Sequence, residues 1–226
     1  MSKKLFRYFC FSLLFVLISC APKPKMTPPP LYQERELSRD EVISKSGSDI
    51  EILKAITDIS IEKNNEPYSF ISASLLIKKP GWIHMRMYQL GILVRDFVIK
   101  DDTLYVLSGK NDEKLKKLGK ELYNAIFWWN TYRSGEMSGE GETYVIRTED
   151  REIHLDKTTL LPLKQEIRTL NKYIQVVYHE PVNNDGFWYP ALLNIYMDDF
   201  TFSVRLKKLI KNPSPGEFDF QIPSES

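Results

Sequence analysis

Residues 69–100 read SFISASLLIKKPGWIHMRMYQLGILVRDFVIK and contain the clearest sign of the fold. They consist of short apolar runs separated by turn residues such as Pro80-Gly81,. Within residues 69–78 the odd positions Ile71, Ala73, Leu75 and Ile77 are apolar, whereas Ser72 and Ser74 occupy the even side. Alternation with a period of two predicts β-strands that belong to a sheet with one dry face.

The next run shows the same alternation, with Ile83, Met85 and Met87 on one side and polar residues on the other. On both sides of residues 69–100, similar runs separated by short turns predict about eleven strands in all, mostly antiparallel because the connections are short. The expected strands are Ile52–Ile61, Ser69–Lys78, Gly81–Gln89, Ile92–Lys100, Leu104–Ser108, Thr143–Thr148, Arg151–Leu155, Leu163–Leu170, Tyr173–His179, Tyr189–Met197 and Phe200–Ile210.

Residues 112–129 have a different rhythm and predict one amphipathic helix of roughly five turns. Apolar side chains recur there every three or four residues, lysines fill the other face, and Asn111 can cap the start,. Residues 130–142 contain three glycines and are expected to be mobile. The fold class expected is therefore α+β, dominated by antiparallel β-structure.

The N-terminus, MSKKLFRYFCFSLLFVLISC (residues 1–20), has the pattern of a secretory signal peptide,. A basic head precedes Phe9–Ile18, an apolar run too short for a permanent membrane span,. Its end, Leu17-Ile18-Ser19-Cys20, resembles the lipobox of bacterial lipoproteins. That resemblance implies cleavage before Cys20 and acylation of its thiol and new amine.

Cleavage would change the composition that matters for function. Loss of residues 1–19 removes three basic side chains and takes the formal charge from +1 to −2. Cys10 would be discarded and Cys20 alkylated, which excludes cysteine catalysis, thiolate metal sites and internal disulfides. The near-zero net charge argues against a nucleic-acid-binding protein.

Two segments are expected after the signal peptide. Residues 20–48 comprise the acylated cysteine, a proline-rich tether and a short arm, and residues 49–226 comprise the folded domain,. Ala21 stands where Gram-negative lipoproteins that stay in the inner membrane commonly have aspartate. Its presence favours anchoring in the outer membrane, with the domain facing the periplasm.

No catalytic constellation is evident in the sequence. The histidines at positions 84, 154 and 179 lack metal-ligand spacing, and the serines lack a G-x-S-x-G setting,. Asp58 with Glu62, and the acidic cluster at 149–152, are more simply surface and turn carboxylates than a glycosidase pair,. We therefore expect a binding protein without catalytic residues, metal or cofactor.

Several local motifs occur in the order found in the LolA/LolB-like superfamily of periplasmic lipoprotein carriers and receptors. The ordered set resembles that superfamily over roughly residues 50–222, and the lipobox favours the anchored, LolB-like branch. The resemblance implies an unclosed half-barrel whose concave face is covered by the amphipathic helix. The motifs are residues 79–86 (KPGWIHMR), 88–91 (YQLG), 156–163 (DKTTLLPL) and 189–191 (YPA).

The resemblance also implies a function and a set of site residues. The cargo would be an acylated lipoprotein or a lipid, received from a soluble periplasmic carrier and delivered to the outer membrane. Leu90 matches the exposed apolar residue of a membrane-insertion loop, although Gln89 replaces the proline of that loop. Flexible and aromatic side chains suit an acyl-chain cleft; the candidates are Phe70, Met85, Met87, Leu118, Leu122, Ile126, Trp128 and Trp129.

Two other functions remain open from the sequence. The protein could be a structural or assembly lipoprotein of the envelope that binds a protein partner through the same sheet. An envelope hydrolase is a third possibility, and it would require one of the carboxylates to be catalytic.

Overall fold

The computed structural model describes residues 36–47, 49–110, 113–169, 172–214, 216 and 219–222. The predicted signal peptide, Cys20, the proline-rich tether and the capping Asn111 lie outside the described residues.

The described chain forms one antiparallel sheet of twelve strands and three short helices, so the predicted fold class is confirmed. All eleven expected strands are present. The twelfth, β6, lies in the segment 130–142 that was expected to be mobile, and that prediction was wrong. The strands are β1 (Ile52–Lys63), β2 (Glu66–Lys78), β3 (Trp82–Gln89), β4 (Ile92–Lys100), β5 (Thr103–Ser108), β6 (Glu136–Glu140), β7 (Thr143–Arg147), β8 (Arg151–Asp156), β9 (Pro162–Thr169), β10 (Lys172–Asn184), β11 (Phe187–Met197) and β12 (Phe200–Lys211).

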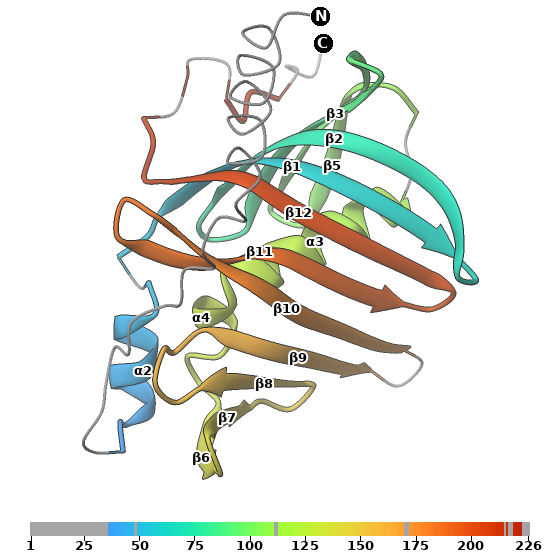
Figure 1. Cartoon of the computed structure of the whole chain (residues 1–226). Coiled ribbons are helices and arrows are strands. Elements are labelled where there is room, and N and C mark those ends of the chain that lie inside the picture. Colours follow the sequence, from blue (N-terminus) through green and yellow to red (C-terminus); the bar gives the residue numbers. More distant parts are fainter. Residues whose placement is uncertain are drawn as a thin grey trace, which may run out of the picture.

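The sheet consists of two meanders that meet in the middle. Its strand order is β5-β4-β3-β2-β1-β12-β11-β10-β9-β8-β7-β6, so the first and last strands are neighbours. We call β1–β5 the first wing and β6–β12 the second wing. Strands β5 and β6 are the two free edges, which leaves the curved sheet unclosed (Figure 1).

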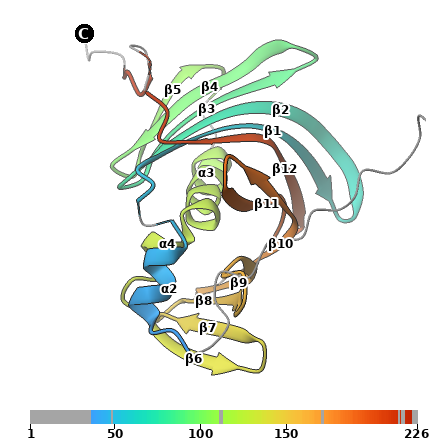
Figure 2. The same ribbon diagram turned by 60° about the vertical axis from the view of Figure 1, so that its left-hand side comes forward.

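The concave face of the sheet holds the hydrophobic core and is crossed by α3 (Glu113–Ile126) and α4 (Trp128–Thr131) (Figure 2). The predicted single helix is broken at Phe127, whose φ of −99° and ψ of 38° are not helical. A Cβ on Gly119 would lie only 2.7 Å from Ile99 Cδ1, so glycine allows α3 to pack closely on β4. This helical connection carries the chain from the edge of one wing to the edge of the other.

A further helix, α2 (Arg39–Lys45), precedes the sheet and also contributes to the core. It begins with a capping box in which Ser38 and Glu41 satisfy each other's backbone N–H groups,. Val42 and Ile43 are buried and join the same hydrophobic cluster as the concave sheet face.

The convex face is partly covered by the C-terminal segment. The Phe220 ring lies 5.9 Å from the Trp82 ring and 6.3 Å from the His84 ring, centroid to centroid. His84 is buried there although it is on the opposite side of β3 from the core residue Met85. In the described ranges, no helix has both the length and the apolar character needed to cross a membrane.

Candidate functional site

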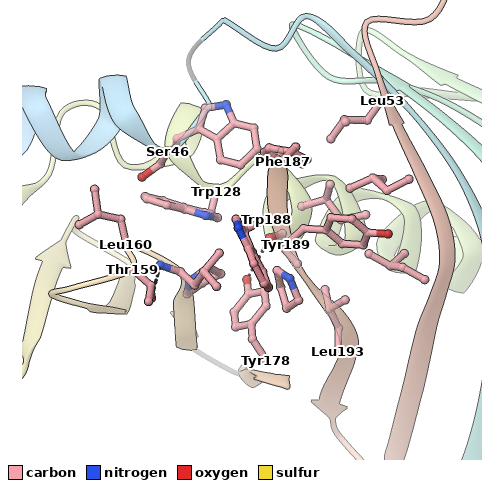
Figure 3. A pocket seen from close by; sticks show the side chains of 18 of the residues that line it. Ser46, Leu53, Trp128, Thr159, Leu160, Tyr178, Phe187, Trp188, Tyr189 and Leu193 are labelled. Atoms are coloured by element: carbon pink, nitrogen blue, oxygen red, sulfur yellow. Dashed lines mark hydrogen bonds between the residues drawn. The ribbon is translucent and has the colours of Figure 1, made fainter. Parts of the chain in front are cut away.

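An apolar cavity of about 140 Å³ lies where α3 ends and α4 begins (Figure 3). Its walls come from the last turn of α3, from α4, from the turn between β8 and β9, and from the β10–β11 hairpin. Leu53 of β1 and Leu206 and Leu209 of β12 form the floor on the sheet side. The end of α2 reaches the rim with Lys45 and Ser46.

Aromatic side chains dominate the cavity. Phe187 and Tyr189, on one side of β11, stack with ring centroids 5.9 Å apart. In Figure 3 the Trp188 ring lies between Trp128 and Tyr178. Such side chains supply a large apolar area with little conformational freedom to lose when a ligand binds.

A neutral hydroxyl inside the cavity holds two of its walls together. The Tyr178 hydroxyl donates to the backbone oxygen of Ala125 (3.0 Å) and lies 3.1 Å from Gln165 Oε1. Burial raises the pKa of the Tyr178 phenol well above its usual value, so the hydroxyl stays protonated,. Tyr178 thereby ties the last turn of α3 to β10.

The turn between β8 and β9 is held by its own hydrogen bonds. The Asp156 carboxylate accepts hydrogen bonds from the backbone N–H (2.7 Å) and hydroxyl (2.8 Å) of Thr159. Burial acts to raise the pKa of Asp156, but the hydrogen bonds from Thr158 and Thr159 outweigh it and lower that pKa,. Lys45 is the one charged residue that lines the cavity among the described residues, and it is exposed at the rim.

An ion pair also connects α3 to the second wing. Arg151 Nη1 lies 3.3 Å from Glu121 Oε2, and their side chains are only 13% and 9% exposed. This pair joins the middle of α3 to β8. Tyr178 and the ion pair together attach the helix to the wing that forms most of the cavity.

The cavity contains only three of the eight residues predicted to line an acyl-chain cleft, namely Ile126, Trp128 and Trp129. Four others, Met85, Met87, Leu118 and Leu122, are buried in the core rather than at the cavity.

The structure contradicts the prediction that Phe70 lines the acyl-chain cleft. Phe70 is 57% exposed and lies on the same side of β2 as Ser72, away from the core residues Ile71 and Ala73. Phe70 therefore does not join the other cleft candidates. The physical reason is its even position in β2, where the buried odd positions are Ala73, Leu75 and Ile77.

The aromatic hairpin from Phe187 to Tyr189 was not predicted to be part of the site. These three consecutive aromatic residues follow the turn Asp185-Gly186 directly. Bulky aromatic side chains on both faces of a strand next to a turn are a signal that could have identified it. Tyr189 was expected to begin a strand, and neither Phe187 nor Trp188 was assigned to a site.

Leu90 lies in the tight turn between β3 and β4, where Gln89 pairs with Ile92. Its side chain is 98% exposed and its φ is +52°, with Gly91 completing the turn. Ile92 is 69% exposed, and Leu93 is also exposed. The turn therefore presents adjacent apolar side chains to solvent, which is more unusual than a single exposed leucine.

The histidines of β3 and β8 lie on strand faces directed away from the cavity. His84 Nε2 is 2.8 Å from Asp96 Oδ1, and His154 Nε2 is 2.6 Å from Glu152 Oε1. Both have the hydrogen-bonded strand setting expected from the sequence. Within the described ranges, no group of three or more His, Cys, Asp or Glu side chains could hold a metal ion.

The size of the cavity limits what it can hold. A cavity of about 140 Å³ is close to the ~150 Å³ of an apolar protein cavity that binds benzene, which has six carbons,. A long acyl chain needs more space than that. Such a ligand would require α3 and α4, or the β10–β11 hairpin, to move.

No protein-family model matches this chain, and no curated protein matches its sequence. Solved structures do match its fold. A LolA-superfamily protein from Nitrosomonas europaea has a TM-score of 0.57 at 8% identity, covering 80% of this chain and 96% of that one.

A putative outer membrane lipoprotein-sorting protein domain from Vibrio parahaemolyticus has a TM-score of 0.50 at 14% identity, covering 81% of this chain and 97% of that one. A DUF1329-family protein from Desulfovibrio piger also has a TM-score of 0.50, at 11% identity, with coverages of 81% and 95%. At such identities these matches show a shared fold.

Proposed function

We propose that the protein is a LolB-like envelope lipoprotein, anchored in the outer membrane through Cys20, that binds acyl chains and helps to insert them into that membrane. The cargo is an acylated lipoprotein or a lipid, and the donor is a soluble periplasmic carrier. The observation that carries the proposal is the aromatic-lined cavity at the junction of α3 and α4. The fold shared with a LolA-superfamily protein and a lipoprotein-sorting domain supports it.

The affinity would come from burial of apolar surface. Each methylene removed from water contributes about 0.8 kcal/mol, so six carbons contribute roughly 5 kcal/mol before the costs of association. That is too little for tight binding, and a longer bound segment requires the cavity to widen. The interactions of Tyr178 with Ala125 and of Arg151 with Glu121 are the restraints on that widening.

Release into a bilayer needs no chemical step, because the bilayer offers the chain the same burial. The exposed turn with Leu90 and Ile92 is suited to enter the apolar region of the membrane,. In this proposal Leu90 is the insertion residue.

Binding is tested with the chain from residue 21 onward and a fluorescent fatty-acid probe. We expect saturable binding that a triacylated lipopeptide displaces. Lys45→Trp places a bulky ring at the cavity rim and should weaken binding at least about tenfold, whereas Lys208→Trp, an exposed position on β12, should not,. Absence of both probe binding and displacement would refute the proposal, and a stoichiometric protein partner without lipid would favour an assembly role instead.

A further inference from the structure

The two free edges of the sheet differ in their chemistry. Edge strand β5 reads TLYVLS and contains neither a charge nor a proline. Edge strand β6 reads EMSGE, with a glutamate at each end. Natural sheets usually protect their edges with charges or proline, since an unprotected edge pairs readily with another strand. Strand β5 lacks these protections.

The main-chain groups of β5 are arranged to accept such a strand. Asp101 and Asp102, with φ of 51° and 60°, form a two-residue turn, which makes Lys100 and Thr103 a hydrogen-bonded pair,. Hydrogen-bonded and non-hydrogen-bonded pairs alternate along an antiparallel ladder. The N–H and C=O groups of Leu104 and Val106 therefore point away from β4, the only strand that pairs with β5 in the described chain. The register shifts at Leu107, between the Val106–Phe97 and Ser108–Asp96 pairs, so this alternation holds from Thr103 to Val106,.

We propose that β5 pairs antiparallel with β5 of a second copy of this protein, around a two-fold axis at Val106. Antiparallel pairing sets the Asp101-Asp102 turn of each copy beside Lys110 of the other, so two attractive charge contacts flank the apolar centre. The side chains from Leu104 to Leu107, which are partly exposed in one copy, become buried at the junction.

The same pairing at the other edge is unfavourable. Two antiparallel copies of β6 would bring Glu136 of one copy against Glu140 of the other, and like charges directly opposite each other destabilise a ladder,. The charges therefore favour pairing through β5 over pairing through β6.

A two-fold axis perpendicular to the sheet leaves both concave faces, and both cavities, on the same side of the dimer.

Cysteine cross-linking of the full-length protein in bacterial envelopes tests the proposal. Opposed residues of a hydrogen-bonded antiparallel pair have Cα atoms about 5.5 Å apart, within the range of a disulfide. Val106→Cys should give a disulfide-linked dimer under mild oxidation. Ser138→Cys, at the centre of β6, is the matched control, and the unsubstituted chain reports any background from Cys10 and Cys20.

A second substitution tests the charge contacts. Adding Lys110→Glu to the Val106→Cys chain turns both flanking contacts repulsive and should lower the rate of cross-linking about tenfold. Circular dichroism of each variant shows whether it folds. The proposal is overturned if folded Val106→Cys protein stays monomeric, if Ser138→Cys cross-links equally well, or if Lys110→Glu has no effect. None of these results depends on acyl-chain binding.

Discussion

Replacing Arg151 by methionine should cost about 3 kcal/mol of folding free energy, because it leaves the Glu121 carboxylate buried without its partner. The two side chains are 13% and 9% exposed and 3.3 Å apart. Breaking a buried ion pair by removing one member typically costs about 3–5 kcal/mol, and the residual exposure of this pair places it at the lower end. For a domain of this size that corresponds to a fall in melting temperature of roughly 6–12 °C.

The assay is urea unfolding followed by tryptophan fluorescence, since Trp128 and Trp129 are buried next to α3. The double variant Glu121→Leu with Arg151→Met removes both charges and should recover most of the lost stability. If the double variant loses as much unfolding free energy as the two single variants lose together, the penalty does not arise from an unpaired carboxylate and the reasoning is refuted.

The same variants bear on the cavity. If α3 must move to admit an acyl chain, the double variant should bind the fatty-acid probe more tightly than the parent protein, because one restraint on that movement is gone. Unchanged affinity in a stably folded double variant would show that the helix does not move about this contact.

The other predictions concern the surface. Leu90→Glu should slow delivery of cargo to liposomes without changing the melting temperature. Leu163→Glu, at an exposed leucine on β9, should leave both the delivery rate and the melting temperature unchanged. Hydrogen bonding from Lys164, aided by Arg168, lowers the pKa of Glu166 to about 2 from an ordinary 4.5. The folding stability that the ionised Glu166 carboxylate contributes is therefore complete above pH ~4.5 and is lost as the pH falls toward 2,. Glu166→Gln should therefore destabilise the protein by about 1–2 kcal/mol at pH 7 and by much less near pH 2, as urea titrations at the two pH values can check. Phe220→Ala should cost about 1–2 kcal/mol and increase quenching of tryptophan fluorescence by acrylamide, as Trp82 loses its cover,; unchanged quenching would contradict the packing described.

The strands were predictable because their burial has a period of two. In β2 and β3 the alternating residues Ala73, Leu75, Met85 and Met87 are all buried on the concave face. Strand β6 was missed since an edge strand with two glutamates and a glycine buries little and shows no such alternation. Phe70 was misassigned because its aromatic character was given more weight than its position on the polar side of β2.

The position of the cavity could not be derived from the sequence, because it depends on contacts between segments that are distant along the chain. Ser46, Trp128, Leu160 and Trp188 meet there from four different parts of the chain. The sequence pattern located the helix and its apolar stripe, but it could not show at which end of the helix the packing is incomplete.

The pairing of β1 with β12 has a consequence for how the chain folds. Leu53 pairs with Lys211 and Lys63 with Phe200, so the centre of the sheet joins residues from opposite ends of the described chain. Contacts of such long range form slowly, because a large loop must close first. During synthesis, the middle of the sheet can close only after β12 has emerged. A chain that stops before Phe200 would expose two open strand edges in the centre of the sheet, on β1 and β11, where they can pair with other chains,.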